Sequence, residues 1–197
     1  MFWWLKEIFS STRFLSIQGD NGFWKSKRMY EVVLPTGFTA IMLFLYCQFP
    51  DAFIADFITS ITKNVFQFMV FVVPFHLAAL GAFATFERQL LDEELKGTRA
   101  EIWKWSNTDH EYFLEQLTLR QYISLLFGYL CTLGIVFIIV YILLTVLDFQ
   151  YLSGVYFPLV RDISIGVVLF FIAHYALLSI YGITFLFDKL NGLSRKP

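Results

Sequence analysis

Two histidines are the only ionisable side chains deep inside the long apolar stretches of this sequence. His76 and His174 each lie near the middle of an uncharged interval. An ionisable side chain at such depth is costly to expose to lipid, so both positions are candidate functional sites. Three roles are open: a hydrogen bond between helices to a tyrosine, threonine or backbone carbonyl, the lining of a gated polar path, or axial ligation of a b-type haem. The haem alternative requires the two imidazoles to face each other.

Other polar residues in the apolar stretches could line a path together with the histidines. Pro74 lies two residues before His76 and removes a backbone donor, so we expect it to bend the helix at the same depth. A kinked helix with a histidine at its midpoint is compatible with gating. The candidate pore and gating residues are His76, His174, Pro74, Gln67, Thr39, Thr132 and Ser179.

Two stretches outside the apolar intervals mix basic residues with aromatics. Such a mixture suits membrane headgroups, because aromatic rings sit at the interface and Lys and Arg attract anionic lipid. It can also stack on and neutralise a nucleotide or a short single-stranded nucleic acid. The candidate lipid- or ligand-binding residues are Trp24, Lys25, Lys27 and Arg28 in the first stretch and Arg99, Trp103, Lys104 and Trp105 in the second.

Composition and charge spacing indicate an integral membrane protein. Of the 197 residues, 57% are hydrophobic, 20% aromatic and only 16% charged, whereas soluble domains carry about 25% charged residues. Four uncharged intervals are each long enough for the roughly 20 residues that cross a bilayer as a helix. Their limits predict spans at about residues 32–50, 64–86, 121–147 and 163–187. Because lipid cannot hydrogen-bond the backbone, the predicted fold is an all-α, single transmembrane domain over residues 1–197.

The basic residues are unevenly distributed over the segments between the spans. Thirteen of the 15 Lys and Arg residues lie before the first span, between the second and third, or after the fourth, and only Lys63 and Arg161 lie in the other two connections. Short loops rich in Lys and Arg stay cytoplasmic. The sequence therefore predicts a multi-pass protein of the inner (cytoplasmic) membrane with both termini inside, residues 1–30 forming a cytoplasmic or interfacial segment.

Two segments outside the spans are predicted to be helical. Residues 1–15 divide into apolar and polar sides and begin with tryptophans, which is typical of a helix lying in the membrane interface. Residues 87–120 keep good helix formers on both sides of a break at 106–107, and Thr108 with Glu111 fits a capping box. We therefore expect an antiparallel helical hairpin over 87–120 that reaches about 25 Å into the cytoplasm.

The sequence also argues against several function classes. It contains no phosphate-binding Gly-rich loop, GxSxG, HExxH or Cys–His arrangement with ligand spacing, so we expect neither an enzyme nor a metal site. Ion-coupled transporters usually carry charged residues within their spans and paired inverted repeats. The predicted spans here hold no Asp, Glu, Lys or Arg, and no such repeats are found in the sequence. Apart from the haem alternative, no cofactor is expected.

In its four spans, its cytoplasmic bias and the bases Lys25, Lys27 and Arg28 beneath the first span, the chain resembles the small four-span membrane effectors of bacterial antiviral systems. In the Hailong type, a nucleotide-polymerising partner makes a short DNA ligand that controls a membrane channel. The resemblance implies a ligand-gated effector in antiviral defence and assigns a role to no residue. The expected function is a homo-oligomeric ion channel controlled from its cytoplasmic face. A non-enzymatic scaffold subunit that docks a soluble partner through the hairpin is the alternative, and a haem carrier the third.

Overall fold

Four long helices dominate the structure, a computed structural model. They are α2 (Leu34–Gln48), α3 (Phe57–Thr85), α5 (Leu119–Val146) and α6 (Phe157–Leu190). A π-helical turn, η3 (Met29–Val33), runs directly into α2. The structure describes residues 3–19, 26–53, 57–85, 89–95, 100–108, 110–146 and 157–191.

All four predicted spans are confirmed as helices that are long and apolar enough to cross a membrane. The qualifying stretches are Met29–Gln48, Phe57–Thr85, Leu119–Val146 and Ile163–Lys189. Three of them begin and end within about three residues of the predicted limits, and the second starts seven residues earlier than the predicted 64. Contrary to the prediction of uncharged spans, these stretches include charged residues near their ends, namely Glu31, Lys63, Arg120, Asp188 and Lys189. The coarse fold is therefore the one that charge spacing predicts.

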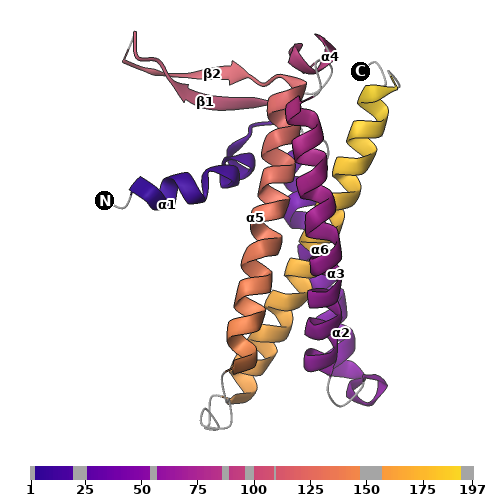
Figure 1. Ribbon diagram of the computed structural model, residues 1–197. Helices are drawn as coiled ribbons and strands as arrows, with labels where there is room; N and C mark the ends of the chain where they lie inside the picture. Colours follow the sequence, from indigo (N-terminus) through magenta and orange to yellow (C-terminus); the bar gives the residue numbers. More distant parts are fainter. Residues whose placement is uncertain are drawn as a thin grey trace.

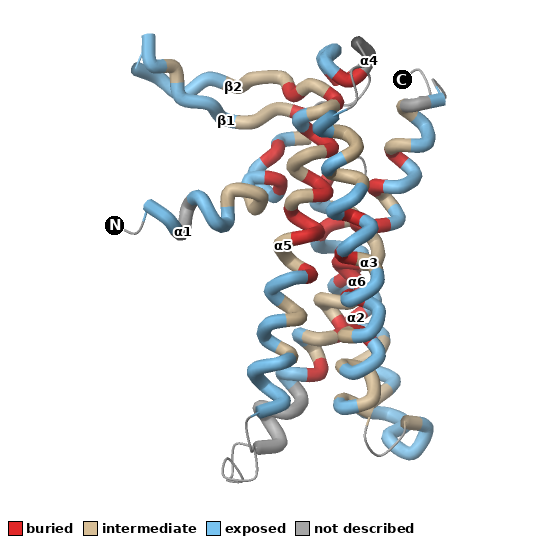
Figure 2. The backbone as a smooth tube through the Cα atoms, viewed as in Figure 1, coloured by how far each residue is buried: buried red, intermediate tan, exposed pale blue. Residues whose placement is uncertain are grey.

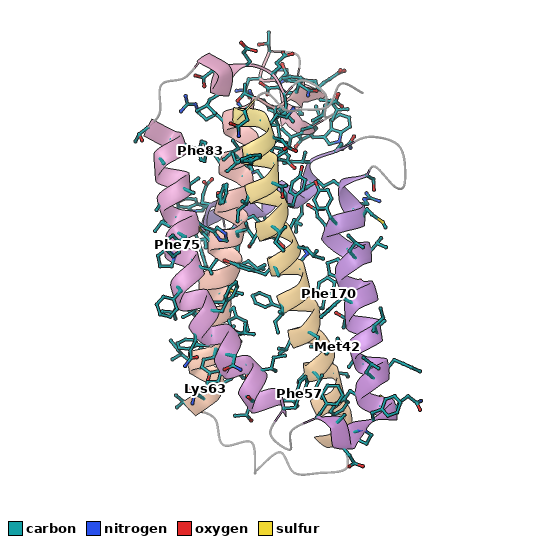
Figure 3. All side chains as sticks on the ribbon, turned by 90° about the vertical axis from the view of Figure 1, so that its right-hand side faces the viewer. Met42, Phe57, Lys63, Phe75, Phe83 and Phe170 are labelled. Carbon is teal, nitrogen blue, oxygen red and sulfur yellow. The ribbon has the colours of Figure 1, made fainter. Side chains whose placement is uncertain are left out.

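The helices lie lengthwise beside one another in two pairs. α3 packs mainly against α5, and α2 packs mainly against α6. Figure 3 shows Phe170 of α6 and Met42 of α2 in the region between those two helices. The N-terminal segment and the end of α6 both lie toward the same end of the bundle, as an even number of spans requires (Figure 1). We call this the hairpin end, after the strands described below, and the other the distal end.

The N-terminal segment lies across the bundle axis rather than along it (Figure 1). It consists of α1 (Trp3–Ile8) and a 3₁₀ helix, η1 (Ser10–Ser16). The predicted helical character of residues 1–15 is thus confirmed for the described residues, in two short pieces. Phe14 is fully buried against the bundle, whereas Trp3 is 72% exposed, so the segment is fixed at η1 and projects at α1.

The predicted helical hairpin between spans two and three is wrong. Of the residues that the structure describes there, only the short α4 (Gln89–Asp92) is helical, and β1 (Glu101–Trp105) pairs with β2 (Tyr112–Gln116) as an antiparallel two-stranded hairpin. The Ser106 N–H donates to the Glu111 carbonyl at 2.9 Å, which closes the turn where a capping box was expected. Tryptophan, isoleucine, tyrosine and phenylalanine favour strands, and here they outweigh the helix formers around them.

The hairpin is joined by its backbone to both neighbouring elements. Gln18, just after η1, exchanges two backbone hydrogen bonds with Glu101 at 2.8 and 3.1 Å. The Leu117 N–H donates to the Ala100 carbonyl, and Leu95 N–H to the Leu117 carbonyl. These contacts fix the hairpin, α4 and η1 on the first turns of α5.

Arg120 in the first turn of α5 connects that helix to the end of α3. Its guanidinium donates to both carboxylate oxygens of Asp92, at 2.7 and 3.1 Å. A further N–H donates to the Phe83 carbonyl at 2.7 Å. The last carbonyls of a helix have no partner within it, so Arg120 satisfies one of them and holds α4 in place.

Burial is concentrated in the half of the bundle nearest the hairpin (Figure 2). The buried residues of α5 all lie between Leu119 and Gly134, and Ile139 and Leu143 beyond them are exposed. At Gly134 a Cβ would lie 2.3 Å from Val73 Cγ2, which only a glycine avoids. The helices α3, α5 and α6 therefore form one packed core toward the hairpin end, and apolar side chains point outward toward the distal end.

Candidate functional site

A group of polar residues is buried where the N-terminal segment meets the bundle. We call Phe14, Lys27, Glu31, Tyr129 and His174 the polar cluster. Lys27, Glu31 and His174 are between 4% and 7% exposed. Phe14 belongs to η1, Lys27 lies just before η3, and Glu31 lies in η3, which leads into α2. Tyr129 and His174 belong to α5 and α6. The cluster thus joins the N-terminal segment to three of the four long helices.

Lys27 and Glu31 form a buried ion pair. The Lys27 Nζ lies 2.8 Å from Glu31 Oε1, and the two residues are one helical turn apart. The ammonium also donates to the Phe14 carbonyl and lies 3.8 Å from the centroid of the Phe14 ring. Burial lowers the pKa of Lys27, and the Glu31 carboxylate opposes that shift. Lys27 thus binds Phe14 through an ion–dipole and a cation–π contact at once.

Pro35 explains why the backbone of Glu31 contacts another helix. In a regular α-helix the Glu31 carbonyl would accept from the amide four residues later, and Pro35 has no N–H. The chain instead forms the π-helical turn η3, and the free carbonyl lies 2.6 Å from Nδ1 of His174. Single turns of π-helix often occur at functional sites.

This contact assigns the tautomer of His174. A carbonyl oxygen can only accept, so Nδ1 carries the proton. In the neutral ring Nε2 then accepts, and it lies 2.9 Å from the Tyr129 hydroxyl. His174 of α6 therefore connects η3 to α5, with both ring nitrogens hydrogen-bonded.

Phe14 is held on its other side by α5. Its ring stacks on Tyr129 at a centroid distance of 5.5 Å and meets the edge of Tyr122 at 6.0 Å. Nearby, the Ser11 and Thr132 hydroxyls are 2.7 Å apart. The N-terminal segment is thus docked by one fully buried aromatic ring, one cation and one hydroxyl pair.

Three tyrosines form a second buried group beside the polar cluster. The Tyr122 hydroxyl lies 3.0 Å from that of Tyr181 and 3.5 Å from that of Tyr30. The Tyr30 and Tyr181 rings stack at 4.2 Å. These contacts connect η3, α5 and α6, and on α5 and α6 they lie about two helical turns nearer the hairpin end.

His76 belongs to a separate contact. Its Nδ1 lies 3.0 Å from the Tyr175 hydroxyl, which joins α3 to α6. Each histidine thus hydrogen-bonds a tyrosine between helices, as the packing interpretation expects. Because both nitrogens of His174 already have protein partners, axial haem ligation would require breaking one of these bonds.

The other pore candidates do not converge in the described part of the chain. Thr39 and Ser179 are buried and donate to carbonyls of their own helices, Pro35 and Tyr175, at 2.8 Å. Gln67 and Pro74 are exposed on the outside of α3, which continues through Pro74 as one helix.

The lipid- or ligand-binding candidates also separate. Lys27 is buried in the ion pair and is not part of an exposed basic surface, while Arg28 beside it is exposed. Lys104 pairs with Glu115 at 2.7 Å on the hairpin. Trp103 and Trp105 are about half exposed, at 52% and 46%. Trp24, Lys25 and Arg99 lie outside the described residues.

Sequence reasoning missed most of the polar cluster. Glu31 served only as the limit of the first uncharged interval, and neither Phe14 nor Tyr129 was singled out. The spacing of Lys27 and Glu31 at i,i+4 was a usable signal, since it places opposite charges on one helix face. Their burial depends on Phe14 folding back from outside the helix, which no local pattern reveals.

Comparison with known proteins adds no relative. No protein-family model matches the chain, and neither the search of curated proteins nor that of solved structures found a match.

Proposed function

We propose that the chain forms a homo-oligomeric membrane channel whose docked N-terminal segment holds it closed, and which opens when a cytoplasmic signal releases that segment. The observation that carries the proposal is the full burial of Phe14 between Lys27 and two tyrosines of α5. Through Lys27 and Glu31, this ring is linked to His174 of α6.

The energetics favour a switch over a purely structural role. A buried ion pair is seldom more stable than apolar residues of the same volume, whereas breaking it from one side costs about 3–5 kcal/mol. A cluster of this kind has two distinct states, intact and broken, and therefore suits control better than permanent support. Displacing Phe14 would expose Lys27 and leave Glu31 with a weakened partner.

The conducting path is proposed to lie between subunits. Within one chain the hairpin half is filled by the buried core, while long apolar faces of α2, α3 and α5 point outward. Four helices enclose little space, and rotational assembly of several copies creates an axial path more readily. Gln67, exposed on α3, is the pore candidate best placed to line such a path.

An anionic ligand is the proposed signal. Arg28 is exposed one residue from the polar cluster, and Trp24 and Lys25 precede it in the chain. A nucleotide or short single strand bound there would attract Lys27 away from Glu31 and Phe14. Charge-assisted contacts to phosphate are strong enough to compete with a buried carboxylate.

A reversible lock tests the proposal. Ser11→Cys with Thr132→Cys, made in a chain that lacks Cys47 and Cys131, replaces two hydroxyls that are 2.7 Å apart and should form a disulfide. In proteoliposomes loaded with a potassium-sensitive dye, ligand-triggered flux should vanish on oxidation and return on reduction. Flux that is unaffected by the disulfide would contradict control by the N-terminal segment, and the absence of flux under all conditions would contradict the channel.

The second candidate is a scaffold subunit that docks a soluble partner. The exposed aromatic residues of the hairpin favour it. It predicts no flux from the purified protein and a partner whose binding is lost when the hairpin tryptophans are replaced by serine.

A further inference from the structure

Four buried residues follow one another at intervals of four along the first span and the turn before it, namely Lys27, Glu31, Pro35 and Thr39. Residues 27–48 form one continuous helix that contains η3. A regular α-helix turns by about 100° per residue, so the 12 positions from Lys27 to Thr39 would place these two side chains about 120° apart around the axis. A regular helix would therefore not direct both toward the same neighbours.

The π-helical turn η3 corrects this rotation. The Leu34 N–H donates to the Met29 carbonyl, five residues back instead of four, and so the turn accommodates one residue more than a regular helix does. With that residue discounted, Lys27 and Thr39 are separated by about 11 regular positions, which leaves them only about 20° apart. The π-helical turn thus lets Lys27 face the bundle on the same side as Thr39.

Pro35 disfavours a regular α-helix over these residues. It offers no N–H to the Glu31 carbonyl, and its ring would collide with that carbonyl in a regular turn. In η3 the same carbonyl lies 2.6 Å from Nδ1 of His174, so it receives a hydrogen bond that the regular helix would not supply. Both effects favour the π-helical register over the regular one.

We infer that Pro35 is a positioning residue for the polar cluster: by excluding the regular α-helix, it keeps η3 in the register that directs the Lys27 ammonium at Phe14. In a regular helix the segment before η3 would rotate by about 100°, the angle of one residue, and carry Lys27 away from the Phe14 ring. Glu31 would leave His174 in the same movement. The inference rests on the proposed function, in which docking of Phe14 closes the channel, and identifies what aims the cation.

Disulfide formation between Ser11→Cys and Thr132→Cys measures docking of η1 on α5 directly. The two hydroxyls are 2.7 Å apart, and the full chain without Cys47 and Cys131 is oxidised mildly in proteoliposomes. The rate of disulfide formation then reports how much of the time η1 is docked. Pro35→Ala supplies the missing N–H to the Glu31 carbonyl and permits the regular helix. We expect it to slow the disulfide at least about tenfold, as loss of a desolvated cation–π contact should.

Two further variants separate the register from a general effect on folding. Pro74→Ala is the matched control, because Pro74 lies inside α3 on its exposed side, and it should change the rate by less than about twofold. Deletion of Val32, a half-exposed residue of η3, removes the extra residue. Combined with Pro35→Ala, it turns Lys27 back toward Phe14 within a regular helix, so it should restore most of the wild-type rate.

Equal rates for Pro35→Ala and Pro74→Ala would overturn the positioning role of Pro35. A slow rate in Pro35→Ala that deletion of Val32 does not restore would also overturn it, because the loss would then not come from the register. Potassium flux through the same variants, without the two introduced cysteines, judges the proposed function separately. If Pro35→Ala slows the disulfide but flux does not rise, closure by the N-terminal segment is contradicted while the role of Pro35 stands.

Discussion

At the residue scale, the contacts of the Lys27 ammonium hold the N-terminal segment on the bundle. The ammonium is surrounded by the Glu31 carboxylate, the Phe14 carbonyl and the Phe14 ring. These three contacts replace the water that burial removes, and a buried charge is tolerated only when so compensated. Phe14 and Lys27 therefore stabilise each other: the ring shields the ion pair from water, and the ammonium holds the ring.

The first prediction concerns this pair. Lys27→Met leaves a buried carboxylate without its cation and should lower the free energy of unfolding by about 3–5 kcal/mol. Adding Glu31→Gln in the same chain should restore most of the loss, because no charge then remains buried. Reversible unfolding in mixed detergent micelles measures both values.

The control for this pair is Arg28→Gln, an exposed neighbour of Lys27. Its effect should stay within about 0.5 kcal/mol, as for most surface substitutions. If Lys27→Met were no more destabilising than Arg28→Gln, the ion pair would not be buried in the functional protein.

At the element scale, the packed half of the bundle depends on close approach of α3 to α5. Gly134 permits it, because a Cβ there would lie 2.3 Å from Val73 Cγ2 and 3.3 Å from the Tyr175 hydroxyl. Val73 is buried and stiff at χ1, so it cannot move aside cheaply.

The second prediction follows from this contact. Gly134→Ala should lower the free energy of unfolding by about 1–3 kcal/mol through overpacking. Gly81→Ala is the matched substitution on α3, where nothing lies within 4 Å of the added Cβ. It should be neutral or stabilise by up to about 1 kcal/mol. The same micelle titration compares them, and equal effects would show that the two helices do not approach closely at Gly134.

The third prediction concerns acid and the clamp at the end of α3. Hydrogen bonds from Arg120 lower the pKa of the Asp92 carboxyl, an effect that slight desolvation opposes and the Arg120 charge reinforces. A carboxyl with a depressed pKa contributes stability above its ordinary value near 4, and the contribution is lost as pH falls through the depressed value. The protection of the α4 backbone amides, taken relative to the intrinsic exchange rate at each pH, should therefore fall below about pH 4.

Asp92→Asn should abolish that acid-induced change and give fast exchange at every pH. Glu111→Gln, on an exposed residue at the hairpin turn, should keep the wild-type profile. An unchanged profile in Asp92→Asn would show that another group causes the acid effect.

The sequence predicted the four membrane spans correctly and the segment between the second and third spans wrongly, and the reason is physical. Lipid imposes a strong constraint, and so the uncharged intervals located the four spans to within a few residues at most ends. Outside lipid the constraint is weak. Leu91 belongs to a short helix and Leu95 follows the isolated bridge residue Glu94, while Trp103 and Phe113 are in strands, although all four lie in a segment rich in helix formers. The polar cluster depends on contacts between residues more than 100 positions apart, and a single sequence carries no sign of them.

At the scale of the whole molecule, the N-terminal segment and the end of α6 both lie toward the hairpin end, which matches four crossings (Figure 1). The excess of Lys and Arg at that end predicts that it faces the cytoplasm. Four of the five tryptophans belong to described segments toward that end, namely Trp3, Trp4, Trp103 and Trp105, whereas the sequence of the connections at the distal end contains none.

The fourth prediction tests that orientation. Asn107→Cys at the hairpin turn, without the native cysteines, should react with a membrane-impermeant maleimide only in inside-out vesicles. Asp51→Cys, at the distal end, should react only in intact cells stripped of their outer membrane. Labelling of Asn107→Cys from outside would reverse the topology and remove the cytoplasmic control that the channel proposal requires.

The central claim is that docking of Phe14 holds the channel closed, and single substitutions at neighbouring positions test it most directly. Phe14→Ala removes the fully buried ring, while Leu15→Ala shortens an adjacent side chain that is 48% exposed. Both proteins should insert and assemble alike, because the four spans are unchanged. Potassium flux from proteoliposomes without ligand should rise at least about tenfold for Phe14→Ala and equal the wild-type value for Leu15→Ala. Equal flux from Phe14→Ala, Leu15→Ala and wild type would contradict the account.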